Sequence, residues 1–249
     1  MSSSAPPLRL VLVLGLLTAL GPSGIDMYLP ALPALASGLR VDTAAVQLSL
    51  MAFYLALGAG QLVAGPLSDV FGRRPPVLAG LALFVAASIG CALAPDLPTL
   101  IAFRLLQGLG ACAGMVTPRA VVRDLYTGVP AARLMGLLSM IYAVSPILAP
   151  LVGSVAADVA GWRAVFWVLA AAGVLALALV WRVLPDSRPA HARDPGGLAR
   201  AVRGYGVLLR DRRFLAPAAV ASLSLAGFFL YVANSAFVFT AHYGVTGRT

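Results

Sequence analysis

Two charged side chains stand inside otherwise apolar stretches, and together they have the chemistry to bind and release a proton. Asp26 lies in the apolar segment 8–35, and Arg104 lies in the apolar segment 98–122. A charge buried in a membrane costs roughly 2.5–3.5 kcal/mol on insertion scales, and protonating a carboxylate removes most of that cost. Arginine stays charged, so it supplies a fixed positive partner or a donor to an anionic group. Gln107, one helical turn beyond Arg104, can join the same polar cluster.

Each of these two residues also has a purely structural interpretation. Asp26 fits a residue that hydrates a helix broken by Pro22 and Pro30 near the outer surface of a membrane. Arg104 fits an arginine that snorkels toward the same surface. The functional interpretation is favoured for both residues, and both alternatives stay open.

A second group of charges lies between two apolar runs, in residues 65–74. Gly65 and Gly72 flank Asp69 there, and Arg73 and Arg74 follow. Because glycine allows the backbone to bend tightly, we interpret this stretch as a membrane-surface turn with a function of its own. An ordinary surface turn would carry similar charges but would not need this glycine spacing.

The composition indicates an integral membrane protein. Hydrophobic residues make up 60% of the chain and charged residues only 11%, whereas soluble domains carry about 25% charged residues. The net charge of +9 raises the possibility of nucleic-acid binding. The arginines fall between apolar segments and not on one basic face, so we expect lipid and no nucleic acid as the surroundings. Cys91 and Cys112 lie in apolar segments and are expected to be buried thiols.

Seven apolar windows have the length of a membrane-spanning helix, which is about 20 residues. They fall near 8–35, 43–65, 75–94, 98–122, 133–157, 161–184 and 214–240. Fourteen of the 18 arginines lie on the side of the N-terminus, so positive charge predicts a cytoplasmic N-terminus. The first window has no clear cleavage site and is expected to be retained as a span.

The chain divides at its one long polar stretch. We predict an N-terminal six-helix bundle over 1–184, a cytoplasmic linker over 185–213, and a seventh membrane helix over 214–249. The pattern of Gly65, Asp69, Gly72 and Arg73 is repeated in Gly153, Asp158, Gly161 and Arg163, at the opposite end of a span. Such an echo is expected of an inverted three-plus-three repeat.

Four motifs resemble the major facilitator superfamily of secondary transporters. Residues 65–74 are similar to its Gly-x-x-x-Asp-x-x-Gly-Arg-Arg loop between the second and third helices. Arg104–Gly110 is similar to the Arg-x-x-Gln-Gly-x-Gly pattern of the fourth helix in proton-coupled members. Ser145–Gly153 resembles the antiporter motif of drug exporters. With Asp26–Pro33, these motifs resemble the Bcr/CflA branch of proton-driven multidrug exporters over essentially the whole chain.

The resemblance implies an all-α polytopic membrane protein with the superfamily's N-terminal six-helix bundle. It implies that Asp69 contacts a helix end of a C-terminal half, and that Arg73 pairs with an acid at the end of span four, where this sequence has Asp124. These contacts would form a latch that favours the outward-facing state. The antiporter helix would contribute Ser145, Pro146, Ala149, Pro150 and Gly153. Ala149 departs from the glycine more common in exporters, which weakens the inference of export.

The implied function is proton-coupled antiport of small apolar or cationic drugs across a bacterial inner membrane. Side chains proposed for the substrate cavity are Tyr28, Tyr54, Tyr142, Tyr231 and Asn234. An importer of metabolites on the same fold is the neighbouring alternative. A membrane enzyme is disfavoured because the chain has no glutamate and its two histidines, His191 and His242, lie in the linker and at the end of span seven. We expect no metal and no cofactor.

Length raises a third interpretation. The superfamily has about twelve spans, and alternating access needs two bundles that rock against each other. Seven spans therefore predict an incomplete chain that lacks the partner C-terminal half-bundle, or an inactive truncated fragment.

Overall fold

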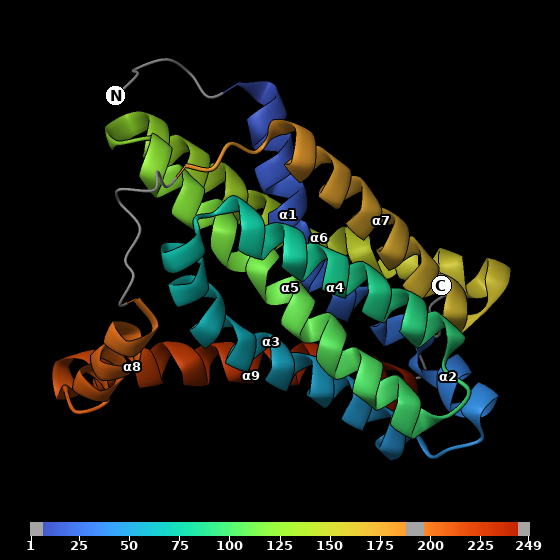
Figure 1. Cartoon of the computed structure of the whole chain (residues 1–249). Helices are drawn as coiled ribbons and strands as arrows, with labels where there is room; N and C mark the ends of the chain where they lie inside the picture. The colour runs from blue at the N-terminus through green and yellow to red at the C-terminus, as the bar shows by residue number, and fades with distance from the viewer. Residues whose placement is uncertain (1–6, 188–196, 244–249) are drawn as a thin grey trace. The chain divides into compact units, whose positions relative to one another are not determined.

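The computed structural model describes residues 7–187 and 197–243, and in these residues all regular structure is helical (Figure 1). The chain forms two compact units, Met1–Leu198 and Ala199–Thr249.

Six segments of the first unit are long and apolar enough to cross a membrane. They are Leu8–Leu39, Thr43–Phe71, Arg74–Leu93, Leu97–Leu125, Gly128–Ala160 and Trp162–Val183. Each corresponds to one of the first six predicted windows. The predicted fold class is therefore confirmed. Four segments run further than their windows, whereas Arg74–Leu93 and Trp162–Val183 match theirs to within one residue at each end.

The first spanning segment is not a single helix. It consists of α1 (Leu8–Asp26), a short 3₁₀ turn η1 (Leu29–Ala31) and α2 (Leu32–Leu39). At the break the Tyr28 N–H donates to the Ile25 carbonyl at 3.1 Å, three residues back and not four. The carbonyl of Gly24, which Tyr28 would bind in a regular α-helix, is thereby released for another partner.

The predicted loop 65–74 is mostly helix, which corrects the sequence interpretation. Helix α3 (Thr43–Phe71) continues through Gly65 and Pro66 and ends at Gly72, and α4 (Arg74–Leu93) begins two residues later. Gly65 has a helical backbone and no neighbour that excludes a side chain. Gly72 makes the turn with φ +91°, a conformation open to glycine and strained for other residues.

The predicted repeat has a counterpart in backbone geometry. Gly72 ends α3 with φ 91° and ψ 173°, and Gly161 ends α6 (Gly128–Ala160) with φ 78° and ψ 173°. Consecutive spans alternate in direction, so these two turns lie at opposite ends of the first unit. Similar turns on opposite faces are what an inverted repeat requires.

Helix α5 (Leu97–Leu125) forms the centre of the first unit. It packs extensively against both α3 and α4, and α1 packs against α6, α5 and α7 (Trp162–Val183) (Figure 1). A Cβ atom on Gly108 would lie 2.5 Å from the Phe53 carbonyl of α3, and one on Gly110 would lie 2.5 Å from the Phe84 nitrogen of α4. These glycines therefore let α5 approach the backbones of α3 and α4 closely.

The second unit contains α8 (Gly197–Leu208) and α9 (Arg212–Tyr243). Helix α9 covers the predicted seventh window, and its 32 residues exceed the length of about 20 that a membrane span requires. Tyr231 is exposed on α9. The side chain of Asn234 lies outside the described residues. The predicted division into bundle, linker and seventh helix remains a prediction.

Candidate functional site

Arg104 lies completely buried inside the first unit, seven residues from the start of α5 and so about 10 Å along its axis. Its guanidinium stacks on three aromatic rings, with the guanidinium carbon 4.2 Å from the Phe53 centroid, 4.5 Å from Tyr28 and 5.9 Å from Phe166. Nη1 donates to the Gly24 carbonyl at 3.0 Å. The snorkelling alternative is therefore wrong, because this side chain points into the protein.

The Arg104 guanidinium binds the break in the first span. Its acceptor, the Gly24 carbonyl, is the one that the 3₁₀ turn releases. Its Nε and Nη2 are buried without a hydrogen-bond partner in the described part of the chain. A buried cation with unused donors is costly, which is typical of a functional charge and not of one kept for stability.

Gln107 joins this cluster, as the sequence predicts. Its Oε1 accepts from Arg104 Nη1 at 2.7 Å, and its Nε2 donates to Ser88 Oγ at 2.7 Å. Ser88 in turn donates to the Phe84 carbonyl at 2.6 Å. The chain of bonds links α5 to α4 and fixes the orientation of Gln107, so the guanidinium meets a rigid acceptor.

Asp26 is the last residue of α1 and is 95% buried, since only 5% of its surface is exposed. Within the described ranges no hydrogen bond or ion pair reaches its carboxylate, so Asp26 and Arg104 do not form a direct pair. The two are connected through the backbone, because Arg104 binds Gly24 two residues before Asp26. Tyr54 lies within electrostatic range of both charges, and Tyr142 within range of Asp26.

Tyr28 does not line a cavity, which corrects its predicted role. The side chain is completely buried, and its hydroxyl lies 2.6 Å from Ser49 Oγ. Its ring packs against Phe166 with centroids 5.5 Å apart, and it forms one wall of the cage around Arg104. Tyr28 therefore acts as a core residue, whereas Tyr54 and Tyr142 are partly exposed and keep their predicted cavity role.

Replacing Tyr28 with phenylalanine tests this correction. We expect Tyr28→Phe to lower the free energy of unfolding by about 0.5–1.5 kcal/mol, because it removes one buried hydrogen bond and keeps the ring. A double-mutant cycle with Ser49→Ala should recover most of that loss as coupling energy. Thermal or denaturant unfolding of the purified variants measures it. Independent effects of the two substitutions would contradict the shared bond.

Helix α6, which contains the predicted antiporter motif, borders an apolar cavity. Helix α6 runs without interruption through Pro146 and Pro150. Ser145 and Ala149 line a cavity of ≈ 450 Å³ between α1 and α6, together with Ser23 and Met27, which stand on either side of Asp26 in sequence. Ser145 Oγ is buried and has no hydrogen-bond partner in the described residues. An apolar cavity with one unused hydroxyl suits a mainly apolar ligand.

Gly153 brings α6 against the break in the first span. A Cβ atom at Gly153 would overlap the Met27 carbonyl oxygen and lie 2.7 Å from the Met27 Cα. Both are backbone atoms and cannot rotate away. Glycine is therefore required at this position if α6 is to contact the backbone beside Asp26.

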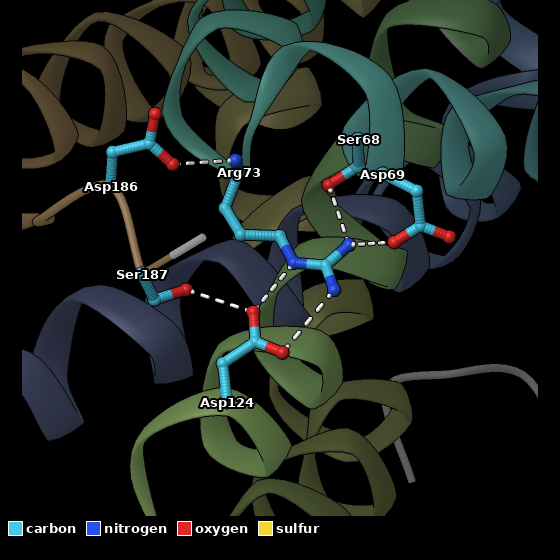
Figure 2. Close-up of polar contacts among 6 residues, drawn as sticks. All are labelled: Ser68, Asp69, Arg73, Asp124, Asp186 and Ser187. Atoms are coloured by element: carbon cyan, nitrogen blue, oxygen red, sulfur yellow. Dashed lines mark hydrogen bonds and ion pairs between the residues drawn. The ribbon is translucent and has the colours of Figure 1, made fainter. Parts of the chain in front are cut away.

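Figure 2 shows the second cluster, which surrounds Arg73 in the turn between α3 and α4. Arg73 Nε donates to Asp124 Oδ2 at 2.7 Å, and its Nη1 donates to Asp69 Oδ1 at 2.8 Å and to Ser68 Oγ at 3.1 Å. The structure thus brings together three residues that the resemblance assigns to one latch. Arg74 points elsewhere, because it donates to the Trp181 carbonyl and its guanidinium lies 5.5 Å from the Trp181 ring.

The electrostatics of this latch keep Arg73 charged. Burial by itself lowers the pKa of Arg73, but the hydrogen bond and charge of Asp124, with those of Asp69, raise it above its ordinary value. The side chain of Arg73 is 8% exposed, that of Asp124 22% and that of Asp69 42%. The Arg73–Asp124 pair is therefore the better shielded from solvent and the stronger of the two ion pairs.

Two residues of this cluster were not predicted from the sequence. The Arg73 backbone N–H donates to Asp186 Oδ1 at 2.9 Å, and Ser187 Oγ donates to Asp124 Oδ2 at 3.0 Å (Figure 2). Both residues follow α7, in the stretch interpreted only as linker. One signal was present: Asp186 is an acid directly after a span, in a region where most charges are arginine.

A comparison with protein-family models identifies the family of the chain. The model described as Major Facilitator Superfamily matches residues 14–248 of the chain. The chain belongs to this superfamily. Its members are transporters and in general not enzymes, so the predicted family is confirmed and the protein is a multi-pass membrane protein of the transporter type.

Individual relatives support the predicted branch of the superfamily, the Bcr/CflA-type multidrug transporters. The chain is 41% identical to an uncharacterized MFS-type transporter of Bacillus subtilis, covering 96% of this chain and 60% of the relative. It is 31% identical to a bicyclomycin resistance protein homolog of Haemophilus influenzae, covering 94% and 59%. It is 33% identical to a multidrug resistance protein of Escherichia coli, covering 88% and 55%. The chain thus spans about 60% or less of the length of these superfamily relatives.

Solved structures agree on the fold. The crystal structure of the human organic anion transporter MFSD10 matches with a TM-score of 0.70 at 18% identity, over 97% of this chain and 67% of that one. At this identity the likeness supports the helical arrangement and says nothing of the substrate.

Proposed function

We propose that this chain is the N-terminal part of a transporter that exports small apolar or cationic drugs in exchange for protons. The observation that carries the proposal is that Asp26 and Arg104 both lie at one helix break, where Arg104 binds the Gly24 carbonyl and Asp26 is the last residue of α1. The acid lies at the end of α1, and the arginine holds the carbonyl two residues before it. Protonation of Asp26 changes the charge at the break, and the break can then change the packing of α1 against α6.

The cavity between α1 and α6 supports a drug-like substrate. Its lining is almost wholly apolar and includes Met140 and Met27, side chains that adapt to ligands of different shape. The relatives named for resistance to bicyclomycin and to multiple drugs support the same substrate class. Export is proposed over import on that support.

The proposed orientation places the N-terminus and the latch in the cytoplasm, with the chain in a bacterial inner membrane. Arg9 at the start of α1 and Arg182 at the end of α7 line one cavity with Leu125 and Tyr126, which mark the end of α5. The latch residue Asp124 lies at this same end. The arginine-rich face is therefore a single end of the first unit, and positive charge favours the cytoplasm for it.

Replacing Asp26 with asparagine tests the proton coupling. Asparagine fills the same space but cannot take up or release a proton, so Asp26→Asn should bring drug export driven by a pH gradient to background. The residual movement of drug should be independent of pH. Fluorescent-substrate efflux checks this result, measured between about pH 6 and 8 in energised cells that express the complete transporter of which this chain is the proposed N-terminal part. Asp42→Asn is the matched control, because Asp42 is exposed before α3 and should export normally.

Two outcomes would overturn parts of the proposal. Export by Asp26→Asn with an unchanged response to the pH gradient would remove Asp26 from coupling. Accumulation of substrate inside the cells, in place of efflux, would favour the importer on the same fold.

A further inference from the structure

Asp186 occupies the space beside the turn that only a glycine leaves open. A Cβ atom on Gly72 would meet the Asp186 carboxylate, with Oδ1 2.7 Å away. That carboxylate accepts the Arg73 backbone N–H at 2.9 Å. Gly72 is therefore required for two reasons, its φ of +91° and the carboxylate that lies against it. The second reason comes from Asp186, which lies 113 positions beyond Arg73 in sequence.

This carboxylate meets the start of α4 where backbone donors are few. Helix α4 begins Arg74-Pro75-Pro76, and proline has no N–H group. The Arg73 N–H is among the few donors at this helix start that need an external acceptor. A carboxylate at a helix N-terminus is stabilised by the helix dipole as well as by the hydrogen bond. Asp186 thus caps α4 from another part of the chain.

Ser187 extends the contact to the other side of the latch. Its hydroxyl donates to Asp124 Oδ2, the oxygen that also accepts from Arg73 Nε (Figure 2). Consecutive residues after α7 therefore hold both partners of the Arg73–Asp124 ion pair, one through the backbone of Arg73 and one through the carboxylate of Asp124.

We propose that Asp186 and Ser187 are positioning residues of the latch, which couple its opening to release of the segment that follows α7. This coupling role rests on the proposed function, because in a complete transporter the segment after α7 leads from the first bundle to the rest of the protein. The latch then has four parts: the turn at Gly72, the ion pair of Arg73 with Asp124, the second acid Asp69, and the Asp186–Ser187 pair. Opening the ion pair frees Ser187, and withdrawing Asp186 uncaps α4.

Amide hydrogen exchange of the purified protein in lipid nanodiscs tests the contact without any transport assay. We expect the Arg73 amide to exchange about tenfold faster or more in Asp186→Ala, because its charged acceptor is gone. Asp186→Asn keeps an acceptor oxygen and should give an intermediate rate. Asp158→Ala, the same change at an exposed residue at the opposite end of the unit, should leave the Arg73 amide unchanged.

A spin label on Pro185→Cys tests the coupling in the reverse direction. Asp124→Ala removes the acceptor of Ser187 and should increase the mobility of the label, and Ser187→Ala should give a smaller increase. A simple structural cap at α4 would not transmit a change at Asp124 to position 185.

The outcomes separate this proposal from the proposed function. Unchanged Arg73 exchange in Asp186→Ala would overturn the capping contact, and unchanged label mobility in Asp124→Ala would overturn the coupling. Equal acceleration by Asp158→Ala would overturn the contact's specificity. Because neither measurement uses a drug or a pH gradient, both hold whether or not the protein exports drugs.

Discussion

Replacing Arg104 with methionine should reduce proton-coupled export to background while changing the free energy of unfolding by less than about 2 kcal/mol. The two effects differ because the guanidinium is costly to bury. Two of its nitrogens have no partner in the described part of the chain, so an apolar side chain of similar length removes that cost. The loss of three ring contacts and of the bonds to Gly24 and Gln107 acts in the opposite direction.

Two further substitutions at Arg104 distinguish charge from geometry. Arg104→Lys keeps the charge but lacks the planar guanidinium, which stacks on Phe53 while its Nη1 binds both Gly24 and Gln107, so it should also fail to export. Arg104→Ala leaves a cavity among the rings and should lower the unfolding free energy by about 2–5 kcal/mol. Efflux assays and unfolding of the purified variants measure the pair of effects. Normal pH-dependent export by Arg104→Met would remove Arg104 from the coupling mechanism.

The sequence predicted the positions of the spans well, but it placed the ends of some of them, such as that of α3, several residues too early. Hydropathy locates the membrane part of a helix, so all six spans of the first unit appeared as apolar windows. It does not show where the helix ends, because a helix can continue into water once its backbone bonds are made. Pro66–Phe71 therefore looked like a loop although α3 continues through it. Gly72 was the one residue there whose backbone had to turn.

The sequence could not show which side chains of the first span face the protein interior, for a related reason. A helical period assigns side chains to faces only while the helix is regular, and α1 ends at Asp26 before the 3₁₀ turn. Tyr28 lies within that irregular stretch, so its burial against Arg104 and Ser49 could not be deduced from spacing. Asp26 and Arg104 could be selected from the sequence, because an isolated charge in an apolar window is unusual whichever face of the helix it lies on.

Some long-range contacts could be predicted because a sequence motif includes both partners, and others could not. The family resemblance placed Asp124 opposite Arg73, and the structure has the two atoms Nε and Oδ2 2.7 Å apart. Asp186 contacts the same residue, Arg73, through its backbone N–H. Almost every residue type has a backbone N–H, so the identity of Arg73 does not indicate this contact. The glycine at position 72 is consistent with that contact, because a larger side chain would meet Asp186. Its positive φ already explains why the residue is glycine, so the sequence offered no reason to expect Asp186 there.

Gly153→Ala should be strongly destabilising, because among the described glycines an added Cβ at this position would come nearest to a backbone atom. The new Cβ would overlap the backbone of Met27, and α6 would have to move away from the break beside Asp26. Overpacking of this kind costs about 1–3 kcal/mol, and contact with backbone places this case at the upper end. We also expect export to fall strongly, because the separation disturbs both the cavity wall and the surroundings of Asp26.

Gly136→Ala provides the matched control within the same helix. Gly136 has no heavy atom within 4 Å of its added Cβ, so alanine there should raise helix stability by about 0.5–1 kcal/mol and leave export intact. Unfolding and efflux measured side by side for the two variants therefore separate a close crossing from a general effect of alanine in α6. If Gly153→Ala were as stable and as active as Gly136→Ala, α6 would not need its contact with the break, and the link between the antiporter helix and Asp26 would be lost.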